Sequence, residues 1–314
     1  MCKKPLIILA GPTAVGKTEL SIQLAKELKG EIISADSMQV YRGMDIGTAK
    51  IKQEEMQGIP HYLVDEFDPD EEFNVMIFQQ RAKQYMEEIY KKGKIPILVG
   101  GTGFYIQSVV YDISFTKEQE PDGFRQEMLA FAKEHGREAL HQKLGEVDSK
   151  SAKTIHPNNV KRVIRALEYY HFTGQKFSEH NETERQKESP YQFIYLVLTC
   201  KRELLYQRIN QRVDQMISNG LVDEVKRLLE NGYGKELVSM QGLGYKEIIP
   251  YLENKISLEE AVYCMKRDTR HFAKRQLTWF RREKEVTMLS KDEFDTTDQL
   301  VQEILCLAKE RGIR

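Results

Sequence analysis

The sequence predicts an α/β fold: a parallel sheet core with helices on both faces, interrupted by a small helical insertion. Three observations predict it. Short apolar strands alternate with helical segments through about the first 110 residues. The first strand leads directly into a glycine-rich turn and a helix. The strand pattern disappears after residue 113 and returns at about residue 191.

The glycine-rich turn has the spacing of a P-loop. Residues 6–9 predict a buried strand, residues 19–28 predict a helix, and Gly-x-x-x-x-Gly-Lys-Thr lies between them. Glycines let backbone N–H groups surround phosphate oxygens, and a helix N-terminus adds partial positive charge. Lys17 supplies a full charge, and the Thr18 hydroxyl suits Mg²⁺. A P-loop NTPase-like core is therefore predicted, with phosphate-binding candidates Gly11, Pro12, Thr13, Ala14, Val15, Gly16, Lys17 and Thr18.

The next strands place a carboxylate near this loop. Residues 31–35 predict a buried strand that ends at Asp36, and ligands bind at the carboxyl ends of parallel strands. Further strands are predicted at residues 61–64 and 95–101, with a helix at residues 74–92 between them and another helix opening at Thr102. The later strand ends in Gly-Gly-Thr, not in the Asp that anchors Mg²⁺ in many P-loop phosphotransferases. Asp36 is thus either a metal anchor or a general base.

The middle of the chain predicts a separate helical insertion. The predicted helices there span residues 127–135, 137–144 and 159–172, followed by a polar, loop-like segment at residues 175–189. A strand at residues 193–198 returns the chain to the core. We expect a core of residues 1–113 and 191–314 and an insertion of residues 114–190. Lys161, Arg162 and Arg165 lie behind a helix cap, where they form either a solvated face or a binding surface.

The C-terminal part predicts a helix at residues 202–219, a long basic helix, and then a short strand and an amphipathic helix. Arg208 and Arg212, four residues apart on one helix face, either reach the phosphates or form surface ion pairs. A glycine-punctuated loop at residues 239–247 precedes a long helical stretch at residues 258–284. Residues 266–284 hold eight Lys and Arg against two acidic residues, interleaved with aromatic side chains that include the only Trp. That pattern indicates a polyanion site such as RNA.

Bulk composition adds fewer constraints. The chain has 47 Lys and Arg against 48 Asp and Glu, a net charge of −1, so its total charge does not suggest nucleic-acid binding. Four widely spaced cysteines argue against a zinc site or a disulfide framework and fit a reducing cytosol. The N-terminal apolar run is too short for a signal peptide or a membrane span. We expect a cytoplasmic protein.

These features leave three classes of function. A P-loop kinase of a small hydroxyl substrate explains the loop, Asp36 and the paired arginines, but it does not need the basic helix. A transferase that moves a group from a diphosphate donor onto RNA explains all four features. A non-catalytic RNA-binding protein with a relic P-loop is disfavoured, because Lys17, Thr18 and Asp36 are intact.

The motifs resemble those of the bacterial tRNA dimethylallyltransferases, also called tRNA isopentenyltransferases. Asp-Ser-x-Gln-x-Tyr followed by Gly-x-Asp-Ile-Gly-Thr-Ala-Lys is the most specific part. The resemblance extends over nearly the whole chain, through residues 11–18, 34–41, 43–50, 99–105, 155–159, 162–168, 242–245 and 274–281. Plant adenylate isopentenyltransferases share the core but use free nucleotides, and they are the nearest alternative. The cysteines of the zinc finger that eukaryotic tRNA enzymes often carry are not found here.

The resemblance implies transfer of a dimethylallyl group from dimethylallyl diphosphate to N6 of the adenosine 3′ to the anticodon, with release of diphosphate. It implies Asp36 as general base, aided by Lys17, Thr18 and Thr102, with Mg²⁺ on Thr18. Residues 11–18 and Arg208 or Arg212 would hold the diphosphate. We expect a monomer and a target adenine flipped out of its stack. The expected tRNA-binding residues are Asp36, Ser37, Met38, Gln39, Thr102, Arg125, Lys161, Arg162, Arg165, Gly242, Gly244, Tyr245, Lys274, Arg275, Gln276, Trp279 and Arg281.

Overall fold

The chain folds into two compact units. A computed structural model describes residues 3–115 and 123–313. One unit, the core unit, comprises Met1–Val110 and Pro190–Arg314, and the other, the insertion unit, comprises Tyr111–Ser189.

The core unit is built on one six-stranded sheet in the order β3-β2-β4-β1-β5-β6, and every paired strand is parallel. This confirms the predicted parallel sheet, although the strand predicted at residues 61–64 is only two residues long. The strands are β1 (Lys4–Ala10), β2 (Gly30–Ala35), β3 (His61–Tyr62), β4 (Ile95–Gly100), β5 (Tyr191–Thr199) and β6 (Val286–Ser290).

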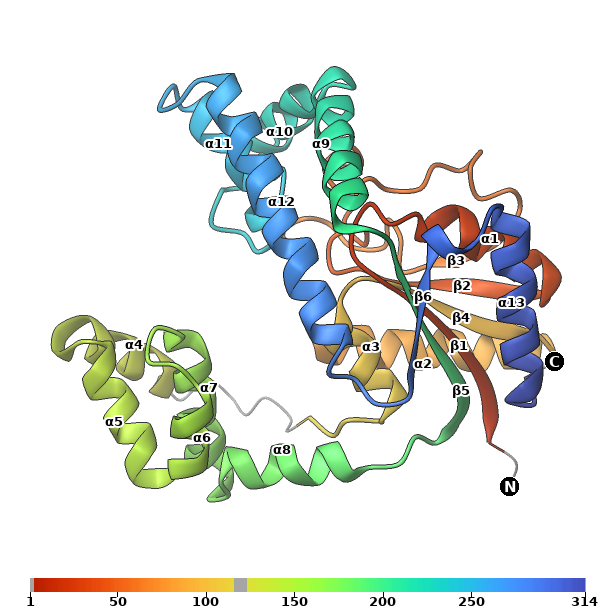
Figure 1. The fold of residues 1–314 in the computed structure, drawn as a ribbon. Coiled ribbons are helices and arrows are strands. Elements are labelled where there is room, and N and C mark those ends of the chain that lie inside the picture. Colours follow the sequence, from red (N-terminus) through yellow and green to blue (C-terminus); the bar gives the residue numbers. More distant parts are fainter. Residues whose placement is uncertain (1–2, 116–122, 314) are drawn as a thin grey trace. The chain divides into compact units, whose positions relative to one another are not determined.

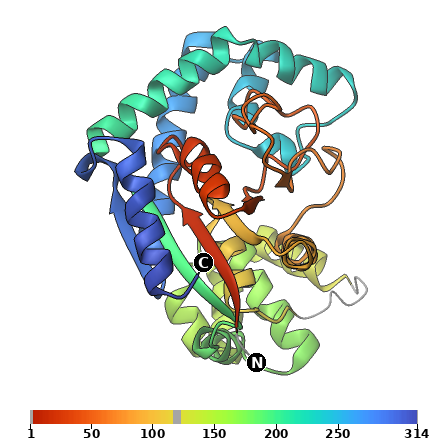
Figure 2. The same cartoon turned by 90° about the vertical axis from the view of Figure 1, so that its right-hand side faces the viewer.

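Helices cover both faces of the sheet, as predicted (Figures 1 and 2). Helix α1 (Lys17–Glu27) carries the chain from β1 outward to β2, whereas α2 (Val75–Lys91) carries it back from β3 to β4. Because both crossovers are right-handed, opposite directions of travel place the two helices on opposite faces. Helix α13 (Thr297–Glu310) packs beside α1, and α3 (Gly103–Val110) packs beside α2.

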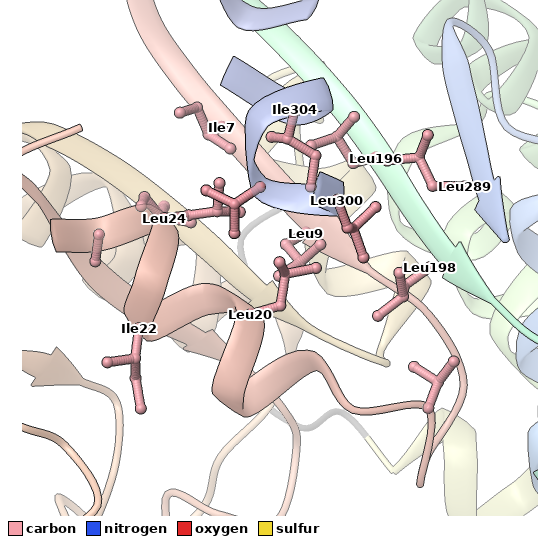
Figure 3. Close-up of a cluster of buried hydrophobic side chains, with 14 of the residues drawn as sticks. Ile7, Leu9, Leu20, Ile22, Leu24, Leu196, Leu198, Leu289, Leu300 and Ile304 are labelled. Carbon is pink, nitrogen blue, oxygen red and sulfur yellow. The ribbon is translucent and has the colours of Figure 1, made fainter. Parts of the chain in front are cut away.

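Apolar side chains of α1 and α13 form a buried cluster with the sheet. Figure 3 shows Leu20 and Leu24 of α1 and Leu300 and Ile304 of α13 directed toward strand residues such as Leu9. All five are at most 1% exposed, and burial of each side chain is worth roughly 1.5–3 kcal/mol. This packing fixes the start of α1, and therefore the P-loop, against the carboxyl end of β1.

A group of helices joins β5 to β6 within the core unit. They are α9 (Arg202–Ser218), α10 (Leu221–Glu230), the short 3₁₀ helix η1 (Ser239–Gln241), α11 (Tyr245–Leu252) and α12 (Leu258–Phe280). Helix α12 packs on both α9 and α11 and also contacts α3. The predicted helix at residues 258–284 therefore exists but ends at Phe280. A second short 3₁₀ helix, η2 (Lys291–Glu293), links β6 to α13.

The insertion unit is entirely helical where it is described. It contains α4 (Phe124–His135), α5 (Arg137–Val147), α6 (Ser149–Thr154), α7 (Val160–Thr173) and α8 (Phe177–Gln186). The prediction of a loop at residues 175–189 is wrong, because α8 lies there. Helix α8 has no buried residue, so the sequence carries no apolar stripe that would reveal it. Its first turn is held by the buried carboxylate of Asp148, which accepts from the backbone N–H of Ser178 at 2.8 Å.

Candidate active site

The P-loop has a backbone that only small residues can follow. Gly11 and Gly16 have φ of 150° and 94°, and Ala14 between them has φ of 64°. A Cβ placed on Gly11 would lie 2.6 Å from the carbonyl oxygen of Leu198 on β5. The close approach of β5 therefore requires glycine at position 11, and the turn leads into the N-terminus of α1 at Lys17.

Lys17 is a partly buried cation held over the loop. Its Nζ donates to the carbonyl oxygens of Gly11 and Pro12 at 3.0 and 2.9 Å. Burial lowers the pKa of Lys17 from 10.5 to about 8; the Asp36 carboxylate opposes this shift and the Arg212 guanidinium adds to it. Asp36 and Arg212 are thus both close enough to Lys17 for their charges to act on it.

Asp36 begins a tight turn immediately after β2. Its Oδ1 accepts from the backbone N–H groups of Met38 at 2.8 Å and Gln39 at 3.3 Å. Among the described residues, no hydrogen bond from the protein reaches the second oxygen, Oδ2. Strand register pairs Ala35 with Gly100 of β4, and the N–H of Thr102 donates to the Ala35 carbonyl. The two predicted catalytic positions, Asp36 and Thr102, therefore follow neighbouring strand ends.

The two arginines of α9 face different groups. Arg212 is half-buried, burial lowers its pKa, and its charge acts on Lys17. Arg208 acts instead on the thiol of Cys200, whose pKa is raised mainly by burial. The sequence left open which arginine lies by the P-loop, and Arg212 is the one whose charge acts on Lys17.

Gln276, which the resemblance assigns to tRNA binding, is built into the core unit. The side chain is 8% exposed. Its Oε1 accepts from the N–H of Thr13, and its Nε2 donates to the carbonyl of Gly101, both at 2.9 Å. A Cβ on Gly101 would lie 2.2 Å from this Nε2. Gln276 therefore anchors the P-loop and the turn after β4 to α12.

Tyr245, another residue that the resemblance assigns to tRNA binding, is buried as well. The predicted RNA-contacting ring is fully buried, and a Cβ placed on Gly47 would lie 2.5 Å from it. Gly244 is buried as well, whereas Gly242 is half-buried and packs against the Met38 side chain. Close backbone packing explains the glycines of this loop without a ligand, because a side chain would not fit.

The basic stretch of α12 divides into two parts. Its first three basic residues have partners within the core unit: Lys266 pairs with Asp214, Arg267 with Asp268, and Arg270 donates to Asn210. Further along the stretch, Lys274, Arg275 and Arg281 are exposed. Trp279 is 37% exposed and lies edge-on to Phe104, with Gly103 beneath its indole. The exposed cations, rather than the full count of eight, form the candidate polyanion surface.

The insertion unit presents its own cations. Lys161 and Arg162 are exposed on the first turn of α7, and Arg165 is half-buried one turn later. Arg125 on α4 forms a bidentate ion pair with the buried carboxylate of Glu168, and both N–O distances are 2.6 Å. Arg125 thus already has a strong intramolecular partner, which weakens its assignment to tRNA binding. His156 accepts from the Asn158 N–H, and Asn159 caps α7, as predicted.

Comparisons with known proteins decide the family. The family model described as IPP transferase matches residues 39–283, more than half of the chain. The chain belongs to the IPP transferase family. A tRNA dimethylallyltransferase from Lachnoclostridium phytofermentans is 58% identical over 310 residues, which cover 99% of both chains. One from Clostridioides difficile is 51% identical over 310 residues, again covering 99% of each chain.

Solved structures of IPP transferases have the same fold. The tRNA isopentenylpyrophosphate transferase of Bacillus halodurans superposes with a TM-score of 0.75 at 46% identity, covering 98% of this chain and 97% of the other. A eukaryotic dimethylallyltransferase solved while acting on tRNA gives a TM-score of 0.80 at 32% identity, covering 98% of this chain and 80% of the other. The resemblance inferred from the motifs is confirmed, and the P-loop-like α/β fold with it.

Two residues at the site of this IPP transferase escaped the sequence reasoning. A Cβ placed on Gly16 would lie 2.9 Å from the Nζ of Lys291, so a second lysine borders the P-loop. Glu224 on α10 is 2% exposed and binds the loop that follows the Asp36 turn. Lys291 stands far along the chain in no motif, and Glu224 resembles any acidic residue in a helix. Neither therefore carried a signal in the sequence.

Within the described parts of the chain, His, Cys, Asp and Glu side chains form no group of three or more that could hold a metal ion. No helix described there is long and apolar enough to cross a membrane.

Proposed function

We propose that the protein transfers a dimethylallyl group from dimethylallyl diphosphate to N6 of the adenosine 3′ to the anticodon of tRNA, releasing diphosphate. The observation that supports this most is that the charges of Asp36 and Arg212 both act on Lys17 at the P-loop of an IPP transferase family member. Transfer of a dimethylallyl group to tRNA agrees with the names of the relatives. The donor, the acceptor atom and the position in tRNA are our proposal.

The cations at the loop suit a leaving diphosphate. Lys17 and Arg212 both lose hydration by burial, and Arg212 lowers the pKa of Lys17 further. Two partly buried positive charges that repel each other bind an anion strongly, because the anion attracts both and so offsets the repulsion. The Gly11–Thr18 backbone would add N–H donors. As the allylic C–O bond breaks, negative charge grows on the diphosphate, and these groups stabilise it there.

Asp36 is suited to take a proton from the attacking amine. Two backbone N–H groups hold its Oδ1 and thereby fix the orientation of the carboxylate. Its Oδ2 is left to accept from the exocyclic N6 of adenine. As the N6–C1 bond forms, the amine loses a proton to Asp36, and the electron pair of the C–O bond leaves with the diphosphate. Thr102, whose N–H donates to the Ala35 carbonyl, would orient the adenine or the Asp36 carboxylate.

A Mg²⁺ ion fits this arrangement. The Thr18 side chain is exposed on the first turn of α1, and Mg²⁺ commonly takes only one or two protein ligands together with phosphate oxygens and water. Thr18 would therefore hold the ion with the diphosphate. When bound, the ion would neutralise charge that develops on the leaving group.

The exposed cations of α12 and of α7 would bind the RNA backbone. Lys274 and Arg275 lie on α12, the helix whose Gln276 is anchored to the P-loop, and Arg281 directly follows that helix. Lys161 and Arg162 lie on α7. Contacts between cations and phosphates supply affinity and orientation, not sequence choice. We further propose that the protein works as a monomer in the cytoplasm.

A labelled-donor assay tests the proposal. The protein is incubated with Mg²⁺, radiolabelled dimethylallyl diphosphate and unmodified tRNA, with parallel arms containing AMP, or ATP and small hydroxyl acceptors. We expect label in tRNA alone, at N6 of the adenosine after the anticodon on nucleoside analysis. Label on AMP would indicate a free-nucleotide prenyltransferase. Phosphate moved from ATP to a small hydroxyl acceptor, with no label in RNA, would favour the kinase interpretation.

A further inference from the structure

We propose that Glu224 is a positioning residue for the prenyl transfer, because it holds the loop that supports the Asp36 turn against α10 and α11. This inference rests on the proposed function and extends it to a residue outside the P-loop and the Asp36 turn. Glu224 touches no reacting atom. It acts through the segment of residues 43–50, here called the support loop.

The carboxylate of Glu224 accepts hydrogen bonds from the backbone of the support loop. Oε2 accepts from the N–H groups of Asp45 at 3.1 Å and Ile46 at 2.8 Å, and Oε1 accepts from the N–H of Gly47 at 3.1 Å. Oε1 also accepts from the hydroxyl of Tyr245 on α11 at 2.7 Å. One buried carboxylate on α10 therefore binds three consecutive backbone amides of the support loop and also a side chain of α11.

The support loop in turn braces the Asp36 turn. The Nε2 of Gln39 donates to the carbonyls of Thr48 and Ala49 at 3.3 and 3.5 Å. The backbone N–H groups of Gln39 and its neighbour Met38 hold the Asp36 carboxylate. The orientation of Asp36 thus depends on where the support loop lies, and Glu224 sets that position.

Packing leaves the support loop little freedom elsewhere. A Cβ on Gly47 would lie 2.5 Å from the Tyr245 ring, and a Cβ on Gly242 would lie 2.4 Å from the Cε of Met38. The loop, the Asp36 turn and the start of α11 therefore fit as one block. Loss of the central carboxylate would loosen the block without opening the P-loop, whose anchor is Gln276.

The chemistry of the site requires a carboxylate rather than an amide. Glu224 is 2% exposed and enters no ion pair in the described part of the chain. Its partners are all donors, and burial followed by the nearby Glu224 charge raises the pKa of Tyr245, which keeps that hydroxyl protonated. In Glu224→Gln, an amide NH₂ would face N–H donors, so an isosteric change would break part of the network.

Glu31 provides a matched control. It is another buried carboxylate of the core unit, 1% exposed, and it accepts from Tyr62, Lys92 and Lys94. It lies at the start of β2, the end opposite to Asp36. Glu31→Gln should therefore destabilise the same sheet without reaching the reaction.

The experiment compares wild type, Glu224→Gln, Glu224→Asp and Glu31→Gln. For each, kcat and KM are measured by label transfer to tRNA, the folded fraction by fluorescence of Trp279, and backbone exchange by mass spectrometry. We expect Glu224→Gln to lower kcat of the folded protein by about 10- to 100-fold, with little change in KM for the diphosphate donor. Amides of residues 38–39 and 45–47 should exchange faster. Glu224→Asp keeps the carboxylate on a shorter side chain and should lower kcat less. If Glu224→Gln does not fold, the comparison is made with Glu224→Asp.

The outcomes distinguish a failure of the positioning role of Glu224 from a failure of the proposed function. If the Glu224 variants keep wild-type kcat for the folded protein, or if Glu31→Gln loses kcat equally, Glu224 is only structural and the inference is wrong. Unchanged exchange at residues 38–39 also overturns it. If wild type puts no label into tRNA, the proposed function fails instead, and the exchange data still decide whether Glu224 holds the Asp36 turn.

Discussion

Lys17 gives the sharpest quantitative prediction, because the protein holds it as a partly buried cation before any anion arrives. The drop of its pKa from 10.5 to about 8 corresponds to roughly 3 kcal/mol of lost folding free energy at pH 7. The unfolded chain binds this proton more tightly than the folded chain does. The penalty is therefore complete below pH 8 and diminishes as the pH rises from 8 to 10.5.

The assay compares wild type with Lys17→Met in denaturant titrations. Trp279 is the only tryptophan and lies in the core unit, so its fluorescence reports unfolding of the unit that contains Lys17. Between pH 7 and pH 9.5, wild type should gain roughly 2 kcal/mol relative to Lys17→Met. Inorganic diphosphate with Mg²⁺ should stabilise wild type at pH 7 and much less at pH 9.5, because the anion favours charged Lys17. In the free enzyme, kcat/KM for the donor should fall above about pH 8.

Parallel pH profiles for the two proteins, agreeing within about 0.5 kcal/mol, would refute this reasoning. That result would mean that Lys17 is not desolvated in the folded protein. A bound diphosphate would then have no desolvated Lys17 charge to stabilise, whatever the activity of the enzyme.

Three further predictions concern residues with different roles. Asp36→Asn should lower turnover by roughly two to four orders of magnitude while tRNA affinity, measured by filter binding, is retained. Lys274→Ala combined with Arg275→Ala should weaken tRNA binding and reduce the slope of log affinity against log salt by about 1.5, as titrations at several salt concentrations would measure. Gln276→Leu leaves the Thr13 N–H and the Gly101 carbonyl unpaired. It should therefore lower the free energy of unfolding by roughly 2–4 kcal/mol and raise KM for the diphosphate donor, but not for tRNA.

Each of these has an outcome that contradicts it. A near-normal rate for Asp36→Asn would remove Asp36 as the general base. An unchanged salt dependence in the double variant would show that α12 does not meet the RNA backbone. A rise in KM for tRNA alone in Gln276→Leu would support Gln276 as an RNA contact, despite its buried position.

The sequence was most informative where chemistry dictates spacing. The P-loop and the strand-end Asp36 could be located because phosphate binding needs glycine, lysine and threonine at fixed intervals. Helix α8 was not predicted because none of its residues is buried, so its sequence has no helical repeat of apolar residues. Gln276 and Tyr245 were assigned to RNA because motif residues are usually read as ligand contacts, whereas the structure uses them as internal supports.

The sequence alone therefore determined the α/β class, the P-loop, the candidate base and the family, since these depend on local patterns along the chain. The tertiary structure decided which residues from distant parts of the chain lie next to one another. It brought Arg212 rather than Arg208 to Lys17, placed Lys291 beside Gly16, and tied the support loop to Glu224 from 177 residues away or more. Such pairings depend on how strands and helices pack, and a residue's neighbours along the chain carry no information about a partner that only packing brings near.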